Sequence, residues 1–299
     1  MNSVKLYKTK KVCGKDTPAV TFLYHTPAGR LLLRLLTRPA VSKSIGFLMD
    51  CRLSALFIPT FIKAHRIRLH EYKPVSYPSF NAFFTREIRE GRRPLAEDTS
   101  AVTAPCDGKL MAYLIAGRQL FRIKNSVYDI DSLLLDRQLA DEFKNGVCLI
   151  FRLTPDDYHR YCYIDDGRVL SLKKIKGILH TVRPIAVGQY PVYAQNTREY
   201  AVLQTKHFGK VIQMEIGALF IGRIVNHKTN GTFKRGQEKG MFEFGGSTVI
   251  LLFQSGAVQI EPAILENTQK NKETIIRMGN KIGEALRHEK EETPCPKQV

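Results

Sequence analysis

The chain has 299 residues, enough for one large domain or for one domain with a small appendage. Hydrophobic residues make up 43% of it and charged residues 25%, as in an ordinary folded protein. The net charge of +18 is not ordinary and indicates a polyanionic partner, such as a nucleic acid, an anionic membrane or an acidic substrate. The six cysteines include no Cys-x-x-Cys pair, which argues against a zinc site or a disulfide scaffold and fits a reducing compartment.

The segment from residue 22 to 69 follows a short polar strand or arm and is rich in leucine and arginine at helical spacing. Its run RLLLRLLTR places leucines on one side of a helix and arginines largely on the other. A second run, FLMDCRLSALFIPTFIKAHRIR, is apolar around much of its circumference and is broken at Pro59. Apolar helix faces with basic flanks suit a bilayer interface. The alternative is a helical cap that packs on the protein's own core.

The same N-terminal region carries a strong charge bias. Between residues 5 and 68 there are 13 Lys and Arg but only two acidic residues, Asp16 and Asp50. No stretch reaches the roughly 18 apolar residues of a spanning helix, and no apolar run has signal-peptide length. We therefore expect a peripheral protein on an anionic phospholipid membrane, at the cytoplasmic face of the cell membrane.

From residue 101 onward the sequence changes to short β-strand runs bounded by Gly, Asp and Asn, such as GVCLIFRL, YAVLQT and STVILLFQ. One helical interruption, DSLLLDRQLADEFKNG, ends at Gly146. We predict an α+β fold in which a basic, amphipathic helical segment precedes a β-rich catalytic core. The expected division is an N-terminal arm and membrane-associating segment at 1–98 and the core at 99–299.

The run FGGST at 244–248 immediately precedes the apolar strand VILLF. Taken alone, Gly-Gly-Ser-Thr is a common turn. It also has the parts for a backbone rearrangement, because the Ser247 hydroxyl can reach the carbonyl carbon of Gly246 through a five-membered ring and form an ester. Glycines at 245 and 246 permit backbone angles that a side chain would forbid, and they leave this carbonyl open to attack. Elimination of the ester and hydrolysis would leave a pyruvoyl group at residue 247.

Four segments, in order, resemble motifs of the phosphatidylserine decarboxylase family. KRGQEKGMFEFGGSTVILLF is similar to the family's C-terminal signature, where a Gly-Ser-Thr triplet holds the self-cleavage site. FNAFFTREIREGRRPL resembles its Phe-Asn-x-Phe-Phe-x-Arg segment, PCDGKL its Asp-Gly motif, and TPDDYHRYCYIDDG its Tyr-His-Arg motif. The order and approximate spacing of these elements also fit the family.

The resemblance implies self-cleavage between Gly246 and Ser247 into a long chain, 1–246, and a short chain, 247–299, which stay associated. It implies a covalent pyruvoyl group derived from Ser247 as the cofactor, with no metal. The substrate would be phosphatidylserine and the products phosphatidylethanolamine and CO2. The pyruvoyl ketone would form a Schiff base with the serine amine of the lipid headgroup. The iminium and the conjugated amide would then take up the electrons that the departing CO2 leaves behind, as pyridoxal phosphate does elsewhere.

The family's self-cleavage relay combines an Asp, a His and the Ser, and Asp107 in PCDGKL matches the Asp. A lone Asp before Gly is otherwise a turn residue. The family pattern Tyr-His-Arg-x-His has two histidines, one for cleavage and the other for decarboxylation. In this sequence His159 occupies the first position, but Cys162 occupies the second.

Three interpretations of this departure stay open. His159 serves both roles; Cys162 substitutes, although a thiol orients a hydroxyl poorly; or another histidine fills the gap. His180, in KGILHTVRP, lies on what should be the next strand, in register to approach Cys162 or His159. We favour His159 together with His180, and the alternative for His180 is a structural histidine.

Three further residues are candidates for substrate binding. Arg160 follows the histidine and could contact the lipid phosphate or carboxylate. The competing interpretation of Arg160 is an ordinary surface charge. Tyr158 and Phe242 could line the apolar part of the pocket, and core packing is the competing explanation for both.

Other classes of protein fit less well. A nucleic-acid-binding protein would show a recognisable module, and its charges would not be interleaved with apolar helices, so we expect no nucleic acid partner. A non-catalytic lipid-binding homologue is favoured only by Cys162. A pyruvoyl decarboxylase of a soluble amino acid would have no use for the basic, apolar N-terminal region. The sequence leaves a homo-oligomer open.

Overall fold

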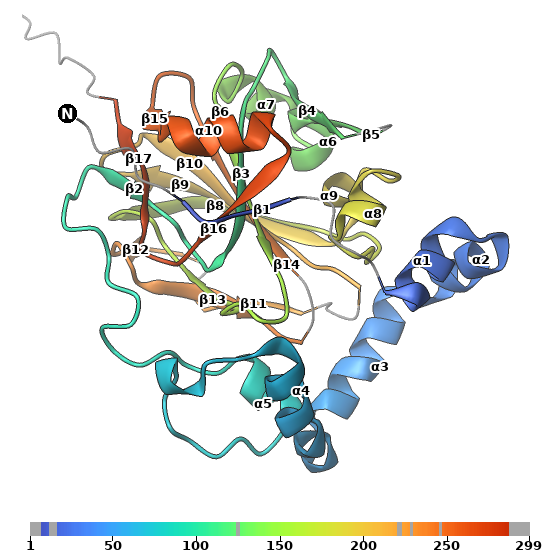
Figure 1. The fold of residues 1–299 in the computed structure, drawn as a ribbon. Coiled ribbons are helices and arrows are strands. Elements are labelled where there is room, and N and C mark those ends of the chain that lie inside the picture. The colour runs from blue at the N-terminus through green and yellow to red at the C-terminus, as the bar shows by residue number, and fades with distance from the viewer. Residues whose placement is uncertain are drawn as a thin grey trace, which may run out of the picture.

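The computed structural model describes residues 7–11, 17–123, 126–219, 223–227, 230–244 and 247–286. Within them, a nine-stranded sheet with antiparallel neighbours forms the centre of the fold (Figure 1). In spatial order its strands are β1 (Thr9–Lys11), β16 (Lys272–Ile276), β3 (Gly108–Leu114), β6 (Val147–Leu153), β14 (Ser247–Phe253), β10 (Lys210–Ile216), β9 (Arg198–Thr205), β8 (Gly167–Ile175) and β12 (Thr232–Phe233).

Smaller sheets accompany this central sheet. One contains β11 (Ile224–Asn226), β13 (Glu238–Phe242) and β7 (Arg160–Cys162), and another contains β15 (Val258–Ile260), β17 (Lys281–Ala285) and β2 (Ala101–Thr103). The strands β4 (Gln119–Ile123) and β5 (Ser126–Asp129) pair only with each other among the described residues.

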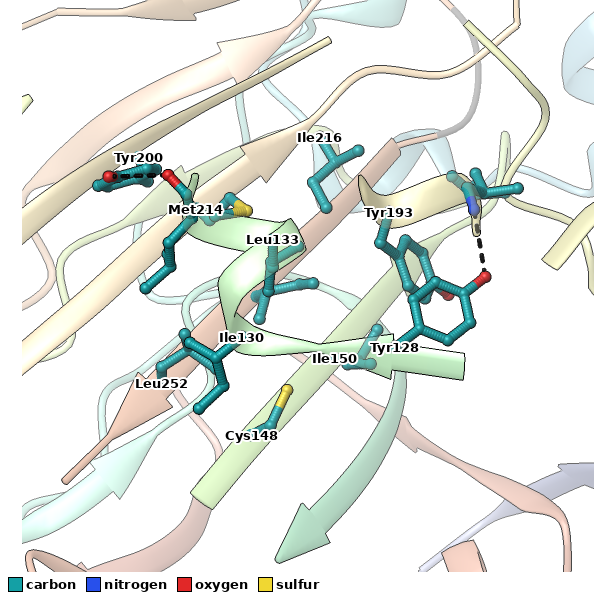
Figure 2. Packing of buried hydrophobic residues seen from close by; sticks show 14 of the residues in the cluster. Tyr128, Ile130, Leu133, Cys148, Ile150, Tyr193, Tyr200, Met214, Ile216 and Leu252 are labelled. Carbon is teal, nitrogen blue, oxygen red and sulfur yellow. Dashed lines mark hydrogen bonds between the residues drawn. The ribbon is translucent and has the colours of Figure 1, made fainter. Parts of the chain in front are cut away.

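The strands in the middle of the central sheet, β6, β14 and β10, are buried on both faces, and β14 is buried along its whole length. Successive side chains of a strand point to opposite faces. Accordingly, Val249 and Leu251 belong to a first core with Tyr161 and Phe242 of the small β11-β13-β7 sheet. The alternate β14 side chains, which include Leu252, belong to a second core (Figure 2). These two cores show which face of the sheet a given site residue occupies.

Helices precede and cover the sheets (Figure 1). The N-terminal ones are α1 (Pro18–His25), α2 (Pro27–Leu36), α3 (Pro39–Asp50), a 3-10 helix (Arg52–Phe57), α4 (Ile58–His65), a 3-10 turn (Leu69–Glu71) and α5 (Phe80–Phe84). The later ones are α6 (Ile130–Leu134), α7 (Arg137–Glu142), α8 (Pro184–Val187), α9 (Val192–Gln195) and α10 (Pro262–Gln269). Prolines open α1, α2 and α3, where the missing N–H would have no helical partner.

The N-terminal helices expose an unusual amount of apolar surface. The three most exposed side chains are Phe47, Leu56 and Leu53, at 78%, 76% and 73%. We call the following set the apolar front: Leu31, Leu32, Leu35, Phe47, Leu48, Leu53, Leu56 and Phe57. Among the α2 leucines, only Leu33 is fully buried, so α2 packs only a small part of its apolar surface against the rest of the protein.

No single helix in the described part of the chain is long and apolar enough to cross a membrane. One pair of helical segments, Pro39–Asp50 and Arg52–His65, would qualify together by length and composition, but it is bent by 82°.

The predicted α+β class is confirmed, with a helical N-terminal segment in front of a β-rich core. Strand β1, inside the expected N-terminal arm, pairs with β16 and thus joins the edge of the core sheet. The helical interruption expected at 131–146 is present, but as two short helices, α6 and α7, and α7 ends at Glu142 rather than at Gly146. Leu135 ends α6 in the left-handed region (φ 47°), and the Asp136 side chain then caps α7.

Candidate active site

The candidate site lies at the edge of the central sheet that is formed by the ends of three neighbouring strands. Ser247 opens β14 opposite Leu153 at the end of β6, and Asp107 immediately precedes β3 on the other side of β6. Because these neighbours are antiparallel, the start of β3, the end of β6 and the start of β14 share that edge. His159 follows β6 after a short turn. The structure therefore brings Asp107, His159 and Ser247 to the same edge of the sheet.

Ser247 is completely buried, and its hydroxyl oxygen has no hydrogen-bond partner among the described residues. Its side chain points to the same face as Val249 and Leu251, toward the first core. A buried hydroxyl without a partner costs free energy, so such a group in a folded protein calls for an explanation. Gly246, with its neighbour Gly245, lies outside the described residues.

His159 is buried and can act as a base. Its Nδ1 lies 3.0 Å from the carbonyl oxygen of Asp157. A carbonyl only accepts hydrogen bonds, so Nδ1 carries the proton and Nε2 is left as an acceptor, without a partner in the described structure. The ring centroids of His159 and Phe84 are 4.1 Å apart. Burial first, and then the nearby Arg86 guanidinium, lower the pKa of His159 to about 3, so the imidazole is neutral at pH 7.

Asp107 is held by an arginine rather than by a histidine. Arg93 donates to both carboxylate oxygens, at 2.8 and 2.6 Å, and the backbone N–H of Met278 donates at 2.8 Å. Arg93 also binds Glu71 at 3.0 Å. All three relay candidates are described residues, yet no hydrogen bond joins any two of Asp107, His159 and Ser247. Their catalytic roles stay predictions.

The cysteine at the second histidine position is buried in β7 and chemically quiet. Its backbone N–H donates to the carbonyl of Pro105 at 2.9 Å. Burial raises the pKa of the Cys162 thiol to about 12, so it remains protonated and uncharged at neutral pH. A proton-accepting role for this thiol is disfavoured.

The expectation that His180 lies on the next strand, in register with Cys162 or His159, is wrong. Strand β8 ends at Ile175, and the Asn196 side chain then bonds both the N–H and the carbonyl of His180 in place of a neighbouring strand. The His180 ring contacts the Tyr24 hydroxyl at 3.1 Å and stacks on Tyr190 with a centroid distance of 4.6 Å.

Tyr24 belongs to the second core and Tyr190 packs against it, so the His180 ring is held against the face of the sheet opposite to Ser247. Burial lowers the pKa of His180 to about 4. A catalytic role for His180 stays a prediction, and the contacts that the structure gives its ring do not support that role.

The three predicted substrate-binding residues are engaged within the protein. Arg160 donates to Glu238 at 2.9 Å and to the carbonyl of Thr85 at 2.8 Å. Tyr158 packs in a small cluster that includes Tyr72 and Phe83, and Phe242 is fully buried in the first core. These contacts are those expected of structural residues, and binding roles for Arg160, Tyr158 and Phe242 remain predictions.

A buried ion pair that sequence reasoning missed supports the turn before His159. Lys109, in the Asp-Gly-Lys run, places its ammonium 2.6 Å from the Asp157 carboxylate. The same carboxylate accepts the backbone N–H of Thr154 at 2.6 Å. This turn presents the Asp157 carbonyl that sets the His159 tautomer. The Thr-x-x-Asp spacing of Thr154 and Asp157 was the available sequence signal.

The FNAFF motif also proves to be part of the site. Asn81 is only 5% exposed, and its Oδ1 accepts the backbone N–H of Phe244 at 3.1 Å while its Nδ2 donates to Asp50 at 2.9 Å. Phe80 and Phe84 pack edge-on against the Phe244 ring, with centroids 5.0 and 5.5 Å away. Helix α5 therefore anchors the chain just ahead of residues 245 and 246, and it connects this anchor to the end of α3.

Replacing Asn81 with alanine is expected to slow any cleavage at residue 246 by about 5- to 150-fold. The substitution removes a buried hydrogen bond worth about 1–3 kcal/mol and frees the Phe244 backbone. Pulse-labelled protein from cell-free translation would report the rate as the conversion of full-length chain to fragments. Asn267→Ala, which removes a remote side-chain contact to Thr274, is the matched control. Equal rates for the two variants would contradict an anchoring role.

A cavity of about 340 Å³ lies between α3 and the anchored segment. Its lining combines two cationic side chains, two acidic side chains and an exposed phenylalanine of the apolar front: Ser42, Lys43, Gly46, Phe47, Asp50, Asn81, Arg223, Glu243 and Phe244. Arg223 lies 3.3 Å from Glu243. Burial raises the pKa of the Glu243 carboxyl. We call this space the α3 cavity.

A second cavity, of about 510 Å³, lies between α2 and the segment around His180. It is lined by Arg30 and Arg34 together with Tyr190. Both cavities border the N-terminal helices, but only the α3 cavity includes a residue of the segment that leads into Ser247.

Comparisons with known proteins identify the family of the chain. The family model for phosphatidylserine decarboxylase matches residues 80–284. The chain is 48% identical over 264 residues to phosphatidylserine decarboxylase proenzyme 2 of Clostridium acetobutylicum, with 88% of this chain and 90% of that protein covered. It is 39% identical over 282 residues to the proenzyme of Fusobacterium nucleatum, with 92% and 93% covered, and 38% identical over 288 residues to that of Clostridium novyi, with 94% and 97% covered. The chain belongs to the phosphatidylserine decarboxylase family.

Proposed function

We propose that this chain cleaves itself between residues 246 and 247, converts Ser247 into a pyruvoyl group, and then decarboxylates phosphatidylserine to phosphatidylethanolamine. As a member of its family the protein is a phosphatidylserine decarboxylase, a lyase, and its relatives' names as proenzymes support self-processing. The observation that carries the cleavage proposal is the buried Ser247 hydroxyl without a partner, at the first position of a core strand and at the same sheet edge as a neutral histidine.

The self-cleavage step can be balanced atom by atom. The Ser247 hydroxyl oxygen bonds to the carbonyl carbon of residue 246, the carbon–nitrogen bond of that peptide breaks, and the hydroxyl proton ends on the released nitrogen. Removal of the Cα proton of residue 247 then breaks its Cβ–oxygen bond and releases the carboxylate of residue 246. Water replaces the nitrogen as ammonia and leaves the pyruvoyl group, whose carbonyl supplies an electron sink for the loss of CO2.

The chain's own residues would prepare these steps. Asn81 holds the segment ahead of the cleaved bond, while the buried position of Ser247 excludes bulk water from the ester. His159, held by the Asp157 carbonyl, offers Nε2 as a proton acceptor at the same edge. Asp107 and Arg93 form the charged boundary of the site beside β3. These groups fit the formation of a pyruvoyl group from Ser247.

We propose that the long chain 1–246 and the short chain 247–299 stay associated after cleavage. Strand β14 lies between β6 and β10; it is paired with β6 along its whole length and with β10 from Thr248 to Phe253. Its burial on both faces means that separating the chains would expose two cores to water. Noncovalent association would therefore survive the loss of one peptide bond.

We further propose peripheral association with an anionic membrane, at the cytoplasmic face, through the segment 1–98, with 99–299 as the catalytic core. The apolar front supplies insertion surface, and basic residues that include Lys43, Arg52 and Lys63 lie among it. The α3 cavity borders both this front and the segment ahead of Ser247. Its two cations and two carboxylates match a headgroup that carries a phosphate, a carboxylate and an ammonium, so we assign the phosphatidylserine headgroup to it.

Two substrates distinguish the role of the α3 cavity from the role of the membrane-binding surface. One is a short-chain phosphatidylserine kept monomeric below its micelle concentration, and the other is long-chain phosphatidylserine in vesicles. Lys43→Glu and Arg223→Glu are expected to raise KM at least about tenfold on both, since each reverses a charge in the cavity. Leu53→Asp with Leu56→Asp should raise KM on vesicles only, because it polarises the apolar front. An unchanged KM of the two charge variants on monomeric substrate would contradict the cavity assignment.

Intact-mass analysis tests the proposed cofactor directly. Folded wild-type protein should give two chains, and the short chain should be lighter by one ammonia than a chain that begins with serine. Reduction with borohydride should add two hydrogens to the short chain and abolish activity. A single species of 34.0 kDa in folded protein would refute self-cleavage.

A further inference from the structure

Buried side-chain atoms without hydrogen-bond partners cluster on two adjacent strands at the candidate site. Within the described residues, Gln213 and Glu215 on β10 each have one unpartnered side-chain oxygen, as does Ser247 on the same face of β14. The unpartnered Nε2 of His159 lies at the same edge of the sheet. A concentration of unsatisfied buried groups is more typical of a reaction site than of a packed core.

The register places Glu215 and Ser247 on the same face. Glu215 pairs directly with Val249, so Ser247 is its diagonal neighbour two residues along β14. Alternation puts the side chains of Glu215, Val249 and Ser247 on the side of the first core. Diagonal positions in an antiparallel pair are about 7–8 Å apart, which a glutamate side chain can span toward a serine hydroxyl.

The Glu215 carboxylate is oriented by an ion pair that leaves one oxygen available. Lys239 of β13 binds Oε2 at 2.6 Å, and both side chains are buried. Asn226 holds the same arrangement by accepting from Lys239 at 3.0 Å and donating to Oε2 at 3.4 Å. Oε1 has no partner among the described residues. Removing two charges from water is expensive, so an apolar pair would suit a purely structural site at least as well.

The ion pair also lies beside the position where Cys162 replaces the second histidine of the family pattern. Cys162 pairs with Glu238, and Lys239 is the next residue of β13. On the β10 side, Gln213 donates its amide N–H to the Cys162 carbonyl at 3.2 Å. The Glu215 carboxylate therefore lies close to Cys162, whose protonated thiol cannot act as a proton acceptor.

On the basis of the proposed self-cleavage, we propose that Glu215 is the proton acceptor for attack by Ser247. Its Oε1 takes the hydroxyl proton as the Ser247 oxygen bonds to the carbonyl carbon of residue 246. It returns this proton to the amide nitrogen as the carbon–nitrogen bond breaks, so the carboxylate is regenerated. Lys239 is a positioning residue that holds the other oxygen. His159 remains available for the Cα proton in the elimination.

Burial favours the protonated form of Glu215 and raises its pKa, against the opposing effect of Lys239. The rate of cleavage should therefore fall as the pH drops through this raised pKa, because the acceptor becomes protonated. The titratable and charged groups that interact with Glu215 from the surrounding segments are Lys239, Glu199, Tyr161, Tyr163 and Cys106.

Glu215→Gln tests the assignment, with cleavage followed by pulse-labelling of the full-length chain between pH 5 and 8. Cleavage should slow by on the order of 100-fold and lose its acidic limb, because the amide cannot accept the proton. Glu273→Gln is the matched control, since Glu273 forms a largely buried ion pair with Arg152, which pairs with Thr248 and so lies on the face opposite to Ser247. The rate of cleavage of this control should stay within twofold of wild type, even where its melting temperature falls as much as that of Glu215→Gln.

Should Glu215→Gln not yield folded protein, Glu215→Gln with Lys239→Gln removes both charges and is judged by the same rate and pH profile. Cleavage within twofold of wild type, or equal slowing in Glu215→Gln and Glu273→Gln, would overturn the role of Glu215. Either result would leave the proposed function intact, because the wild type would still cleave. An uncleaved wild type would instead refute the function and the inference together.

Discussion

Replacement of Ser247 with alanine is expected to leave a single 34.0-kDa chain with no measurable decarboxylation of phosphatidylserine. Alanine has no oxygen to attack the carbonyl of residue 246, so neither the ester nor the pyruvoyl group can form. Because Ser247 is buried and its hydroxyl has no partner in the described structure, its loss should not lower the free energy of unfolding appreciably. Denaturing electrophoresis and release of labelled CO2 measure the two effects.

Thr248→Ala is the control for this substitution. Thr248 is the next residue of β14, is equally buried, and also has an unpartnered hydroxyl, but its side chain points to the opposite face. The variant should cleave and keep its activity. Fragments or labelled CO2 from Ser247→Ala would show that another residue supplies the nucleophile.

Replacement of His159 with glutamine is expected to reduce cleavage or decarboxylation by about 100- to 10,000-fold, the usual contribution of a positioned general base. Its Nε2 is the unpartnered imidazole nitrogen at the Ser247 edge, and its lowered pKa keeps it neutral at pH 7. Glutamine preserves the polar character and much of the volume but cannot accept the proton. Single-turnover assays on chains that have already been cleaved would separate decarboxylation from processing.

The comparison that decides between the two histidines is His180→Gln. His180 hydrogen-bonds Tyr24 and stacks on Tyr190, on the other side of the sheet. We expect this variant to lose stability and to keep cleavage within about threefold of wild type. A loss as large as that of His159→Gln, in a variant that remains folded, would restore His180 to the catalytic set.

The self-cleavage reaction at Ser247 could be proposed from residues that are adjacent in the sequence. Ser247 after two glycines, ahead of an apolar run, suffices to propose an acyl shift, since the reacting atoms belong to adjacent residues. The β-rich core and the helical, basic front were also predictable, because each follows from periodicity and charge within short windows. The run STVILLFQ at 247–254 predicts a strand, and the structure has β14 at Ser247–Phe253.

Partners that lie far apart in the chain were not predictable in this way. His180 was expected on a strand near His159, but the Asn196 side chain draws its backbone out of the sheet. The charge of Arg160 and the apolar rings of Tyr158 and Phe242 predict substrate contacts, yet the contacts that the structure shows for them lie within the protein. Asn81 appeared only as a motif letter, and its bond to Phe244 spans 163 residues of chain.

The sequence by itself determined which serine is the candidate for self-cleavage, that a basic and apolar segment precedes a β-rich core, and the family to which the chain belongs. Only the tertiary structure decided which face of the sheet each candidate occupies, that Arg93 rather than a histidine holds Asp107, and that Glu215 and Ser247 are diagonal neighbours. The physical reason is that bonding between adjacent residues is local, whereas the register of antiparallel strands depends on packing across the whole core.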